Sequence, residues 1–203
     1  MRDALNIVEV ASLQPDYMGF IFYAGSRRTV PDNFQIPEIT HGIKRVGVFV
    51  NESTPSMLNK SIHHSLDFLQ LHGNESPDQC RELRDQGVQL IKVFSVDDGF
   101  DFASTAAYKG TVDFFMFDTK GPGYGGTGMT FDWTRLEKYD QEVPFFLSGG
   151  ISPDNIEGLN RVRRMNIHAI DVNSGVESEP GRKSVEKISR IQKRLLNRHW
   201  LEY

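Results

Sequence analysis

Asp118 has the residue type and the position of a general acid. It ends an apolar run that begins at Phe114, and a glycine-rich stretch follows at residues 121–128. In an extended strand Phe114, Met116 and Asp118 point to one face, so a face that lines a barrel would set this carboxyl group at the mouth. Partial loss of water there raises a carboxyl pKa toward neutrality, as proton donation requires. The alternative is an aspartate that caps a turn or the next helix.

Two small-residue turns indicate an anion site. Ser148-Gly149-Gly150 follows one apolar run, and Asn173-Ser174-Gly175 follows the next. Glycines let the backbone approach a phosphate closely, and residues 175–183 offer a short helix N-terminus whose dipole favours an anion. Tight turns with positive φ explain each glycine alone, but two such turns after successive strands favour phosphate binding.

The glycine-rich stretch fits neither familiar nucleotide-binding fingerprint. Pro122 and the delayed helix spoil the dinucleotide pattern, and no Lys-Ser or Lys-Thr pair completes a Walker A loop. What remains is a loop whose backbone N–H groups can face an anion. An ordinary surface loop is the alternative.

Three further polar side chains follow predicted strands. Gln70 and His72 alternate with leucines, so they are expected to face the mouth and to contact a polar ligand. Arg28 follows the first strand and can bind a carboxylate or phosphate through two parallel hydrogen bonds. The alternatives are a hydrogen-bonded structural histidine and a solvated arginine. The histidines show no ligand spacing with carboxylates, so we predict no metal site.

These residues need a scaffold of alternating strands and helices. Short apolar runs predict seven buried strands, at residues 17–22, 45–50, 68–71, 89–94, 114–117, 144–147 and 167–172. Helices are predicted between them, at residues 31–39, 54–63, 76–86, 99–108, 133–138, 153–162 and 184–198. Repeated units of this size predict one α/β domain over residues 1–203, either a (β/α) barrel or a doubly wound sheet. The number and regular length of the units favour the barrel, whose active sites lie at the carboxyl ends of the strands.

The sequence opens on a helix rather than a strand. Residues 2–13 predict an amphipathic helix with Leu5, Val8 and Ala11 or Leu13 on one face. Seven strands are one fewer than an eight-stranded barrel needs. We therefore expect a (β/α)8 TIM barrel that lacks most or all of strand 1, with an open seven-stranded sheet as the alternative.

Composition excludes several functional classes. The 23 lysines and arginines against 27 acidic residues give a net charge of -4, which argues against nucleic acid and anionic membranes as partners. No apolar run approaches the roughly 20 residues of a membrane-spanning helix. The lone Cys80 excludes an internal disulfide, and no signal-peptide pattern opens the sequence, so we expect a cytoplasmic protein with a small-molecule ligand.

Taken together, these motifs resemble phosphoribosylanthranilate isomerase, the (β/α)8 enzyme family of tryptophan biosynthesis. The resemblance spans essentially the whole chain and rests on residues 1–3, 19–23 with 26–28, 46–51, 69–73, 117–119, 125–128 with 131–133, 147–150 and 171–177. It implies an Amadori rearrangement that converts N-(5-phosphoribosyl)anthranilate to the 1-deoxyribulose phosphate. It implies no cofactor, and it leaves monomer and homodimer open.

The resemblance also implies roles for individual residues. Asp118 would protonate the furanose oxygen as the ring opens to a Schiff base, and Arg28 would contact the anthranilate end. The remaining implied contacts are Gly126, Gly149, Gly150, Ser174 and Gly175 around the phosphate, and Gln70, His72 and Asp171 along the pocket.

The sequence departs from the family at the general base. The family's base is a cysteine in a Lys-x-Cys-Gly segment that immediately precedes the position of Met1. Cys80 cannot replace it, because Ser76 and Pro77 predict that it lies near the start of a helix outside the barrel. For residues 1–203 as written we expect severely reduced turnover. The competing hypotheses are an inactive phosphate-binding barrel and another phosphosugar isomerase of related fold.

Overall fold

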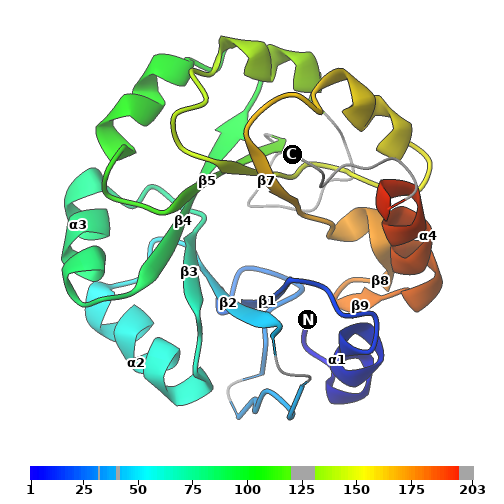
Figure 1. Ribbon diagram of the computed structural model, residues 1–203. Coiled ribbons are helices and arrows are strands. Elements are labelled where there is room, and N and C mark those ends of the chain that lie inside the picture. Colours follow the sequence, from blue (N-terminus) through cyan, green and yellow to red (C-terminus); the bar gives the residue numbers. More distant parts are fainter. Residues whose placement is uncertain (32, 40–41, 120–130, 197–203) are drawn as a thin grey trace.

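Seven parallel strands form a curled sheet at the centre of the molecule (Figure 1). The computed structural model describes residues 1–31, 33–39, 42–119 and 131–196. The strands pair in chain order and are β1 (Tyr17–Ile21), β2 (Lys44–Phe49), β3 (Phe68–Leu71), β4 (Gln89–Val96), β5 (Phe114–Thr119), β6 (Phe145–Leu147) and β7 (Ile167–Ile170). All seven predicted strands and the barrel-like α/β topology are confirmed. Among the described strands, β1 and β7 are the two edges of the sheet.

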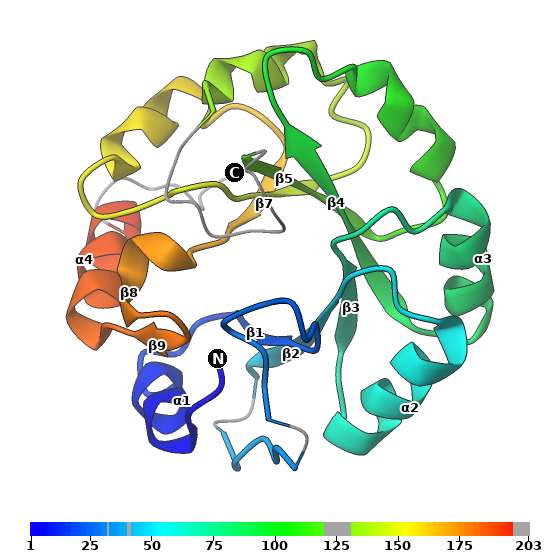
Figure 2. The same ribbon diagram turned by 180° about the vertical axis from the view of Figure 1, so that it is seen from behind.

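Helices surround the sheet on its outer side (Figures 1 and 2). The α-helices are α1 (Ala4–Ala11), α2 (Thr54–His64), α3 (Pro77–Asp85) and α4 (Val185–Leu196). The described residues also form four 3-10 helices: η1 (Phe102–Tyr108), η2 (Trp133–Lys138), η3 (Ile156–Arg161) and η4 (Ser174–Val176). The helix starts follow local chemistry, as at α3, where the Ser76 hydroxyl accepts the Gln79 N–H and Pro77 occupies the first turn.

Two helix predictions are wrong. The described part of residues 31–39 forms no helix, because Pro37 has no N–H to donate and Phe34 instead packs against Phe20. Residues 175–183 form mainly a hairpin of β8 (Glu177–Glu179) and β9 (Arg182–Lys183) rather than a helix. Pro180 precedes Gly181 at φ +90° in the turn between them, a conformation that no helix contains.

The predicted apolar face of α1 is wrong at two positions. Leu5 and Val8 are 76% and 51% exposed, whereas Ala11, which was predicted, is buried together with Ile7 and Val10. Ile7, Val10 and Ala11 are spaced i, i+3 and i+4 and form the stripe that packs on the core. The contacts of Asn6, described below, fix this orientation, and they come from a segment 177 residues away.

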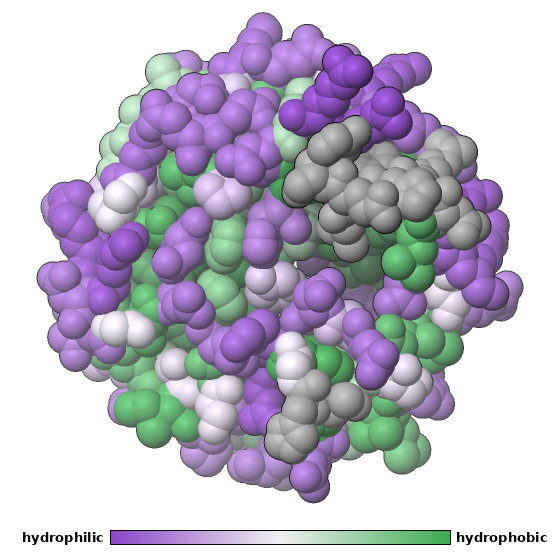
Figure 3. All heavy atoms as spheres, viewed as in Figure 1, coloured by the Kyte–Doolittle hydropathy of each residue, from purple (hydrophilic) through white to green (hydrophobic). Residues whose placement is uncertain are grey.

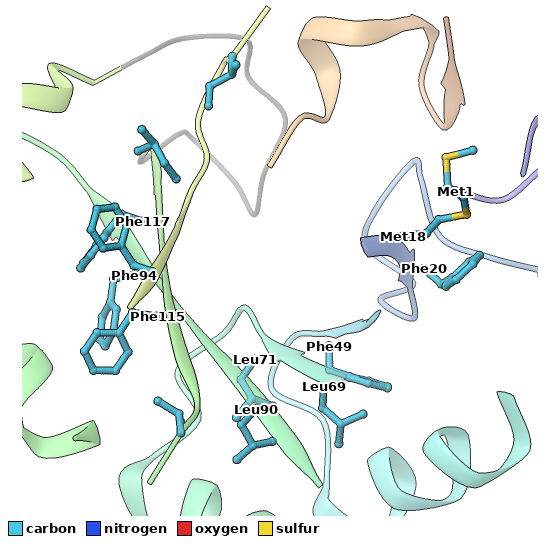
Figure 4. Close-up of a cluster of buried hydrophobic side chains, with 14 of the residues drawn as sticks. Met1, Met18, Phe20, Phe49, Leu69, Leu71, Leu90, Phe94, Phe115 and Phe117 are labelled. Carbon is cyan, nitrogen blue, oxygen red and sulfur yellow. The ribbon is translucent and has the colours of Figure 1, made fainter. Parts of the chain in front are cut away.

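Alternate residues of each strand point to opposite faces of the sheet. The inner face carries one apolar cluster, formed by Val46, Phe68, Ile91, Val93, Met116 and Phe146. The outer face carries the larger cluster beneath the helices, in which Figure 4 shows Phe94, Phe115 and Phe117 together and Phe49, Leu69, Leu71 and Leu90 together. The polar residues that continue the inner rows therefore lie above an apolar floor.

The α1 and α4 helices lie side by side near the edges of the sheet (Figures 1 and 2). The Gln192 amide of α4 donates to the carbonyl of Leu13, just after α1. The Met1 nitrogen donates to the Gly19 carbonyl at 2.7 Å, so the first residues run beside β1. In the part of the chain that the structure describes, no helix combines the length and apolar character needed to cross a bilayer.

Candidate active site

A cavity of about 1110 Å³ lies inside the curled sheet. Its wall at the carboxyl ends of the strands includes Arg28, Gln70, His72, Asp118, Ser148, Gly149, Gly150, Asp171 and Ser174. It continues toward the amino ends, where Tyr17 and His168 line it. Charged and polar residues dominate the rim of the molecular face in Figure 3, with apolar residues between them. These nine residues thus share one space although they come from strands and loops far apart in the sequence.

Asp118 stands at the carboxyl end of β5, on the face that sequence alternation predicts. Its side chain is 11% exposed and lies in the row of Phe114 and Met116. One carboxyl oxygen accepts the Thr119 N–H at 2.8 Å. The other is 3.5 Å from Nε2 of His72. The carboxyl group is therefore held at the mouth above an apolar floor.

His72 faces Asp118 through a defined ring nitrogen. The Gln70 amide nitrogen lies 3.2 Å from Nδ1 of His72. Because an amide nitrogen only donates, Nδ1 is the acceptor in this contact. Nε2, on the other side of the ring, is the atom that lies near the Asp118 carboxyl group. Gln70 and His72 thus line the cavity wall beside Asp118.

The turn after β3 holds His72 in place from the outer side of the sheet. Glu75 accepts the backbone N–H groups of Asn51 and Gly73. It also accepts the Lys92 ammonium at 2.9 Å, in a pair whose side chains are 3% and 0% exposed. Breaking such a buried pair leaves an uncompensated charge, so it fixes the loop strongly.

Asp171 brings a second carboxyl group into the same space. It follows β7, and the Ser148 hydroxyl after β6 donates to it at 2.8 Å. Burial raises the pKa of Asp171, and the nearby charge of Asp118 raises it further. When two carboxyl groups share a site but have different partners, their pKa values are driven apart. The two groups can then take different roles in proton transfer.

The glycine turns after β6 and β7 are shaped by close contacts. Gly149 has φ +93°, and a Cβ there would lie 2.2 Å from Oγ1 of Thr119. A Cβ at Gly175 would lie 2.1 Å from the Ile151 carbonyl oxygen, so this residue packs between turns and does not line the cavity. Gly150 and Ser174 do line it. Gly126 lies outside the described residues.

Arg28 lines the cavity from the loop after β1. Its Nε and Nη2 atoms donate to the Glu177 carboxylate at 2.7–3.0 Å. Lys183 donates to the same carboxylate at 3.1 Å. Sequence reasoning assigned no role to Glu177 or Lys183. No local signal marks this contact, because 149 residues separate Arg28 from Glu177.

Comparison with known proteins identifies the family. The family model described as N-(5'-phosphoribosyl)anthranilate (PRA) isomerase matches residues 1–194. The chain belongs to this family.

Relatives and solved structures of PRA isomerases agree with this assignment. The N-(5'-phosphoribosyl)anthranilate isomerase of Parabacteroides distasonis is 45% identical over 201 residues, which cover 97% of this chain and 91% of the relative. That of Phocaeicola vulgatus is 42% identical and covers 90% and 88%. The crystal structure of the Thermotoga maritima phosphoribosyl anthranilate isomerase superimposes with a TM-score of 0.82 at 30% identity, covering 97% of this chain and 96% of that one. A PRA isomerase structure in complex with reduced 1-(o-carboxyphenylamino)-1-deoxyribulose 5-phosphate gives 0.79 at 27%, covering 97% and 95%.

In this PRA isomerase family member, Cys80 lies away from the cavity. It is fully buried in α3 on the outer side of the sheet. Burial raises the pKa of the thiol to about 11, so it stays protonated and unreactive at neutral pH. The prediction that Cys80 is a small buried residue outside the barrel is confirmed.

Proposed function

We propose that this chain converts N-(5'-phosphoribosyl)anthranilate to 1-(2-carboxyphenylamino)-1-deoxyribulose 5-phosphate, a step of tryptophan biosynthesis. One observation carries the proposal: in a member of the PRA isomerase family, the buried Asp118 carboxyl group shares a cavity with the small-residue turns after β6 and β7. This rearrangement needs an acid for the sugar ring, a binding site for the phosphate and a general base for the C2 proton, and the described cavity offers the first two. The reaction requires no cofactor.

Asp118 is the proton donor in this scheme. Its carboxyl group protonates the furanose oxygen as the bond from C1 to that oxygen breaks, and the lone pair of the anthranilate nitrogen forms the C=N bond of the Schiff base. Removal of the C2 proton then gives an enolamine, which becomes the ketose. The general base is the cysteine that the resemblance places immediately before Met1, so this chain's own residues account for ring opening and binding.

The rest of the cavity binds the two ends of the substrate. Gly149, Gly150 and Ser174 surround the phosphate, with Gly126 as a further contact that the resemblance implies. Gly149 and Gly150 have positive φ, a conformation that other residues rarely adopt, and such a turn can present backbone N–H groups to an anion. Gln70, His72 and Asp171 line the part of the cavity that holds the sugar. Arg28 binds the carboxylate of the anthranilate ring.

Turnover by matched polypeptides tests this proposal. Residues 1–203 preceded by a strand that ends Lys-x-Cys-Gly should consume substrate, followed by anthranilate fluorescence. Asp118→Asn should lower kcat by about 100-fold to 10,000-fold, the usual contribution of a general acid. The exposed Asp85→Asn should not change it. A normal rate in the Asp118→Asn variant would overturn the assignment of the acid, and binding without turnover in every polypeptide would favour a non-catalytic barrel.

We propose a cytoplasmic location on the evidence of the lone cysteine. For assembly we propose a monomer or a homodimer, which sedimentation equilibrium distinguishes. One solved relative is described as monomers derived from the dimeric enzyme of Thermotoga maritima.

A further inference from the structure

Three charged side chains are buried together between the loop after β1 and the β8–β9 hairpin. The side chains of Arg28, Glu177 and Lys183 are 12%, 6% and 9% exposed. Removing charges from water costs several kcal/mol per ion, and apolar residues of similar volume often stabilise a fold as well or better. Stability alone is therefore a weak reason for three buried charges at the wall of the cavity.

Among the described residues, the hydrogen bonds between Arg28 and Glu177 leave one edge of the guanidinium without a partner. Glu177 accepts Nε at 2.9 and 3.0 Å and Nη2 at 2.7 Å. A guanidinium has five N–H groups in a plane, and these contacts occupy the side formed by Nε and Nη2. The end formed by Nη1 and the second N–H of Nη2 matches the two oxygens of a carboxylate. Because Arg28 lines the cavity, this end is the part suited to a planar anion there.

Lys183 is a second donor to the Glu177 carboxylate. Its ammonium donates to Glu177 at 3.1 Å and to the Asn173 side chain at 2.5 Å. Burial lowers the pKa of Lys183, and the charge and hydrogen bond of Glu177 oppose that shift. Burial by itself would raise the pKa of Glu177, but hydrogen bonds from Arg28 and the charge of Lys183 outweigh it and hold this pKa at about 2. The carboxylate that orients Arg28 is thus ionised at neutral pH.

The hairpin that carries these residues is anchored to α1. The Asn6 side chain accepts the Lys183 N–H at 2.7 Å and donates to the Lys183 carbonyl at 2.9 Å. Asn6 is itself 1% exposed, so its amide acts as a buried pairing partner for β9. The Gly181 N–H donates to Glu177 as well. Glu177 therefore projects from a fixed support rather than from a free loop.

From this geometry we infer that Glu177 and Lys183 are positioning residues that direct the free edge of Arg28 toward a carboxylate in the cavity. The inference rests on the proposed function, which supplies that carboxylate on the anthranilate ring. Glu177 fixes the plane of the guanidinium, and Lys183 holds the Glu177 carboxylate in place through its hydrogen bond. They act through Arg28, so their effect is confined to ligands that carry the ring carboxylate.

Calorimetric titration with two ligands tests the inference without turnover. One ligand is reduced 1-(o-carboxyphenylamino)-1-deoxyribulose 5-phosphate, and the other is the same compound without the ring carboxylate. The unsubstituted chain should bind the first at least about 10-fold more tightly, since a charge-assisted hydrogen bond contributes this much. Glu177→Gln should remove most of that preference and change affinity for the second ligand by less than about twofold. The matched control is Glu179→Gln, an exposed glutamate on the same strand, which should change neither.

Two further variants separate positioning from a general structural role. Arg28→Met should lose the preference fully, and the double variant with Glu177→Gln should be no weaker than Arg28→Met alone. If Glu177→Gln fails to fold by circular dichroism, Lys183→Met replaces it, and weaker binding of the carboxylated ligand alone is expected. Equal loss for both ligands in either variant would overturn the inference.

The outcomes also distinguish this inference from the proposed function. If Arg28→Met loses the preference while Glu177→Gln retains it, the positioning role is wrong and the isomerase assignment stands. If the unsubstituted chain binds both ligands equally, Arg28 does not bind the ring carboxylate and the inference falls with it. Failure to turn over substrate in the Lys-x-Cys-Gly polypeptide would count against the proposed function itself.

Discussion

At the scale of single residues, two carboxyl groups at the cavity wall have pKa shifts of opposite direction because their partners differ. Glu177 receives hydrogen bonds from two cations and a backbone N–H. Asp171 receives one hydroxyl and faces Asp118, so its pKa is shifted upward, chiefly by burial. Burial raises the pKa of both groups, and at Glu177 the hydrogen bonds and neighbouring cations outweigh that effect.

The low pKa of Glu177 predicts a defined acid sensitivity. The pKa is about 2 in the folded protein against 4.5 for an ordinary glutamate, so the unfolded chain binds this proton first as pH falls. The resulting stability is complete above about pH 5 and is lost progressively toward pH 2. Urea unfolding should show the unsubstituted chain more stable than Glu177→Gln by roughly 2–3 kcal/mol at pH 7, a gap that closes near pH 2. A gap independent of pH would contradict the assigned ionisation.

Residue types predicted part of this site and missed the rest for a physical reason. Strand alternation placed Asp118, Gln70 and His72 on the cavity face, because alternation is a local property of the chain. The partner of Arg28 depends on how the loop after β1 meets a hairpin more than a hundred residues later. Sequence periodicity carries no information on such a meeting.

At the scale of elements, the turns after the strands combine backbone conformation with close packing. Gly149 has a positive φ and also touches Thr119. Gly87 has φ +80° but nothing within 4 Å of a Cβ built on it. A side chain added at Gly87 would therefore meet only backbone strain, whereas one added at Gly149 would meet both backbone strain and a steric clash.

Alanine at each of these glycines should give different losses. Gly87→Ala should lower the free energy of unfolding by about 1 kcal/mol, because only backbone strain is added. Gly149→Ala should cost about 2–4 kcal/mol and should also weaken binding of inorganic phosphate, because the turn must move away from Thr119. Urea denaturation and phosphate titration measure the two effects. Similar losses in both variants would mean that the contact with Thr119 yields easily.

The positions of the strands could be predicted because most of their residues are buried on both faces of the sheet. The observed strand limits differ from the predicted ones by at most two residues, since a strand covered on both faces reads as an apolar run. Apolar spacing did not fix the buried face of α1, because Ile7 with Val10 fits a helical stripe as well as Leu5 with Val8. The β8–β9 hairpin was missed because its two short strands consist of charged and polar residues and show no apolar alternation.

At the scale of the whole molecule, the strands of the sheet differ in how many neighbouring strands they pair with. Central strands β3, β4 and β5 are paired on both sides, whereas β1 and β7 are the edges of the described sheet. Backbone N–H groups with one open side exchange with solvent through smaller local openings. The first residues cover only part of the β1 edge, through the contact between Met1 and Gly19.

Hydrogen exchange should therefore follow strand order. Amides in β1 and β7 should exchange at least about 10-fold faster than those in β4 and β5, which corresponds to a difference of about 1.4 kcal/mol in opening free energy. In the polypeptide that carries an added strand ending Lys-x-Cys-Gly before Met1, exchange in both edge strands should slow while β4 stays unchanged, because a strand seated between the edges pairs with both. Mass spectrometry of peptides that cover each strand measures this. Slowing at β1 alone would show that the added strand extends the sheet without joining its two edges, and the barrel would then remain open.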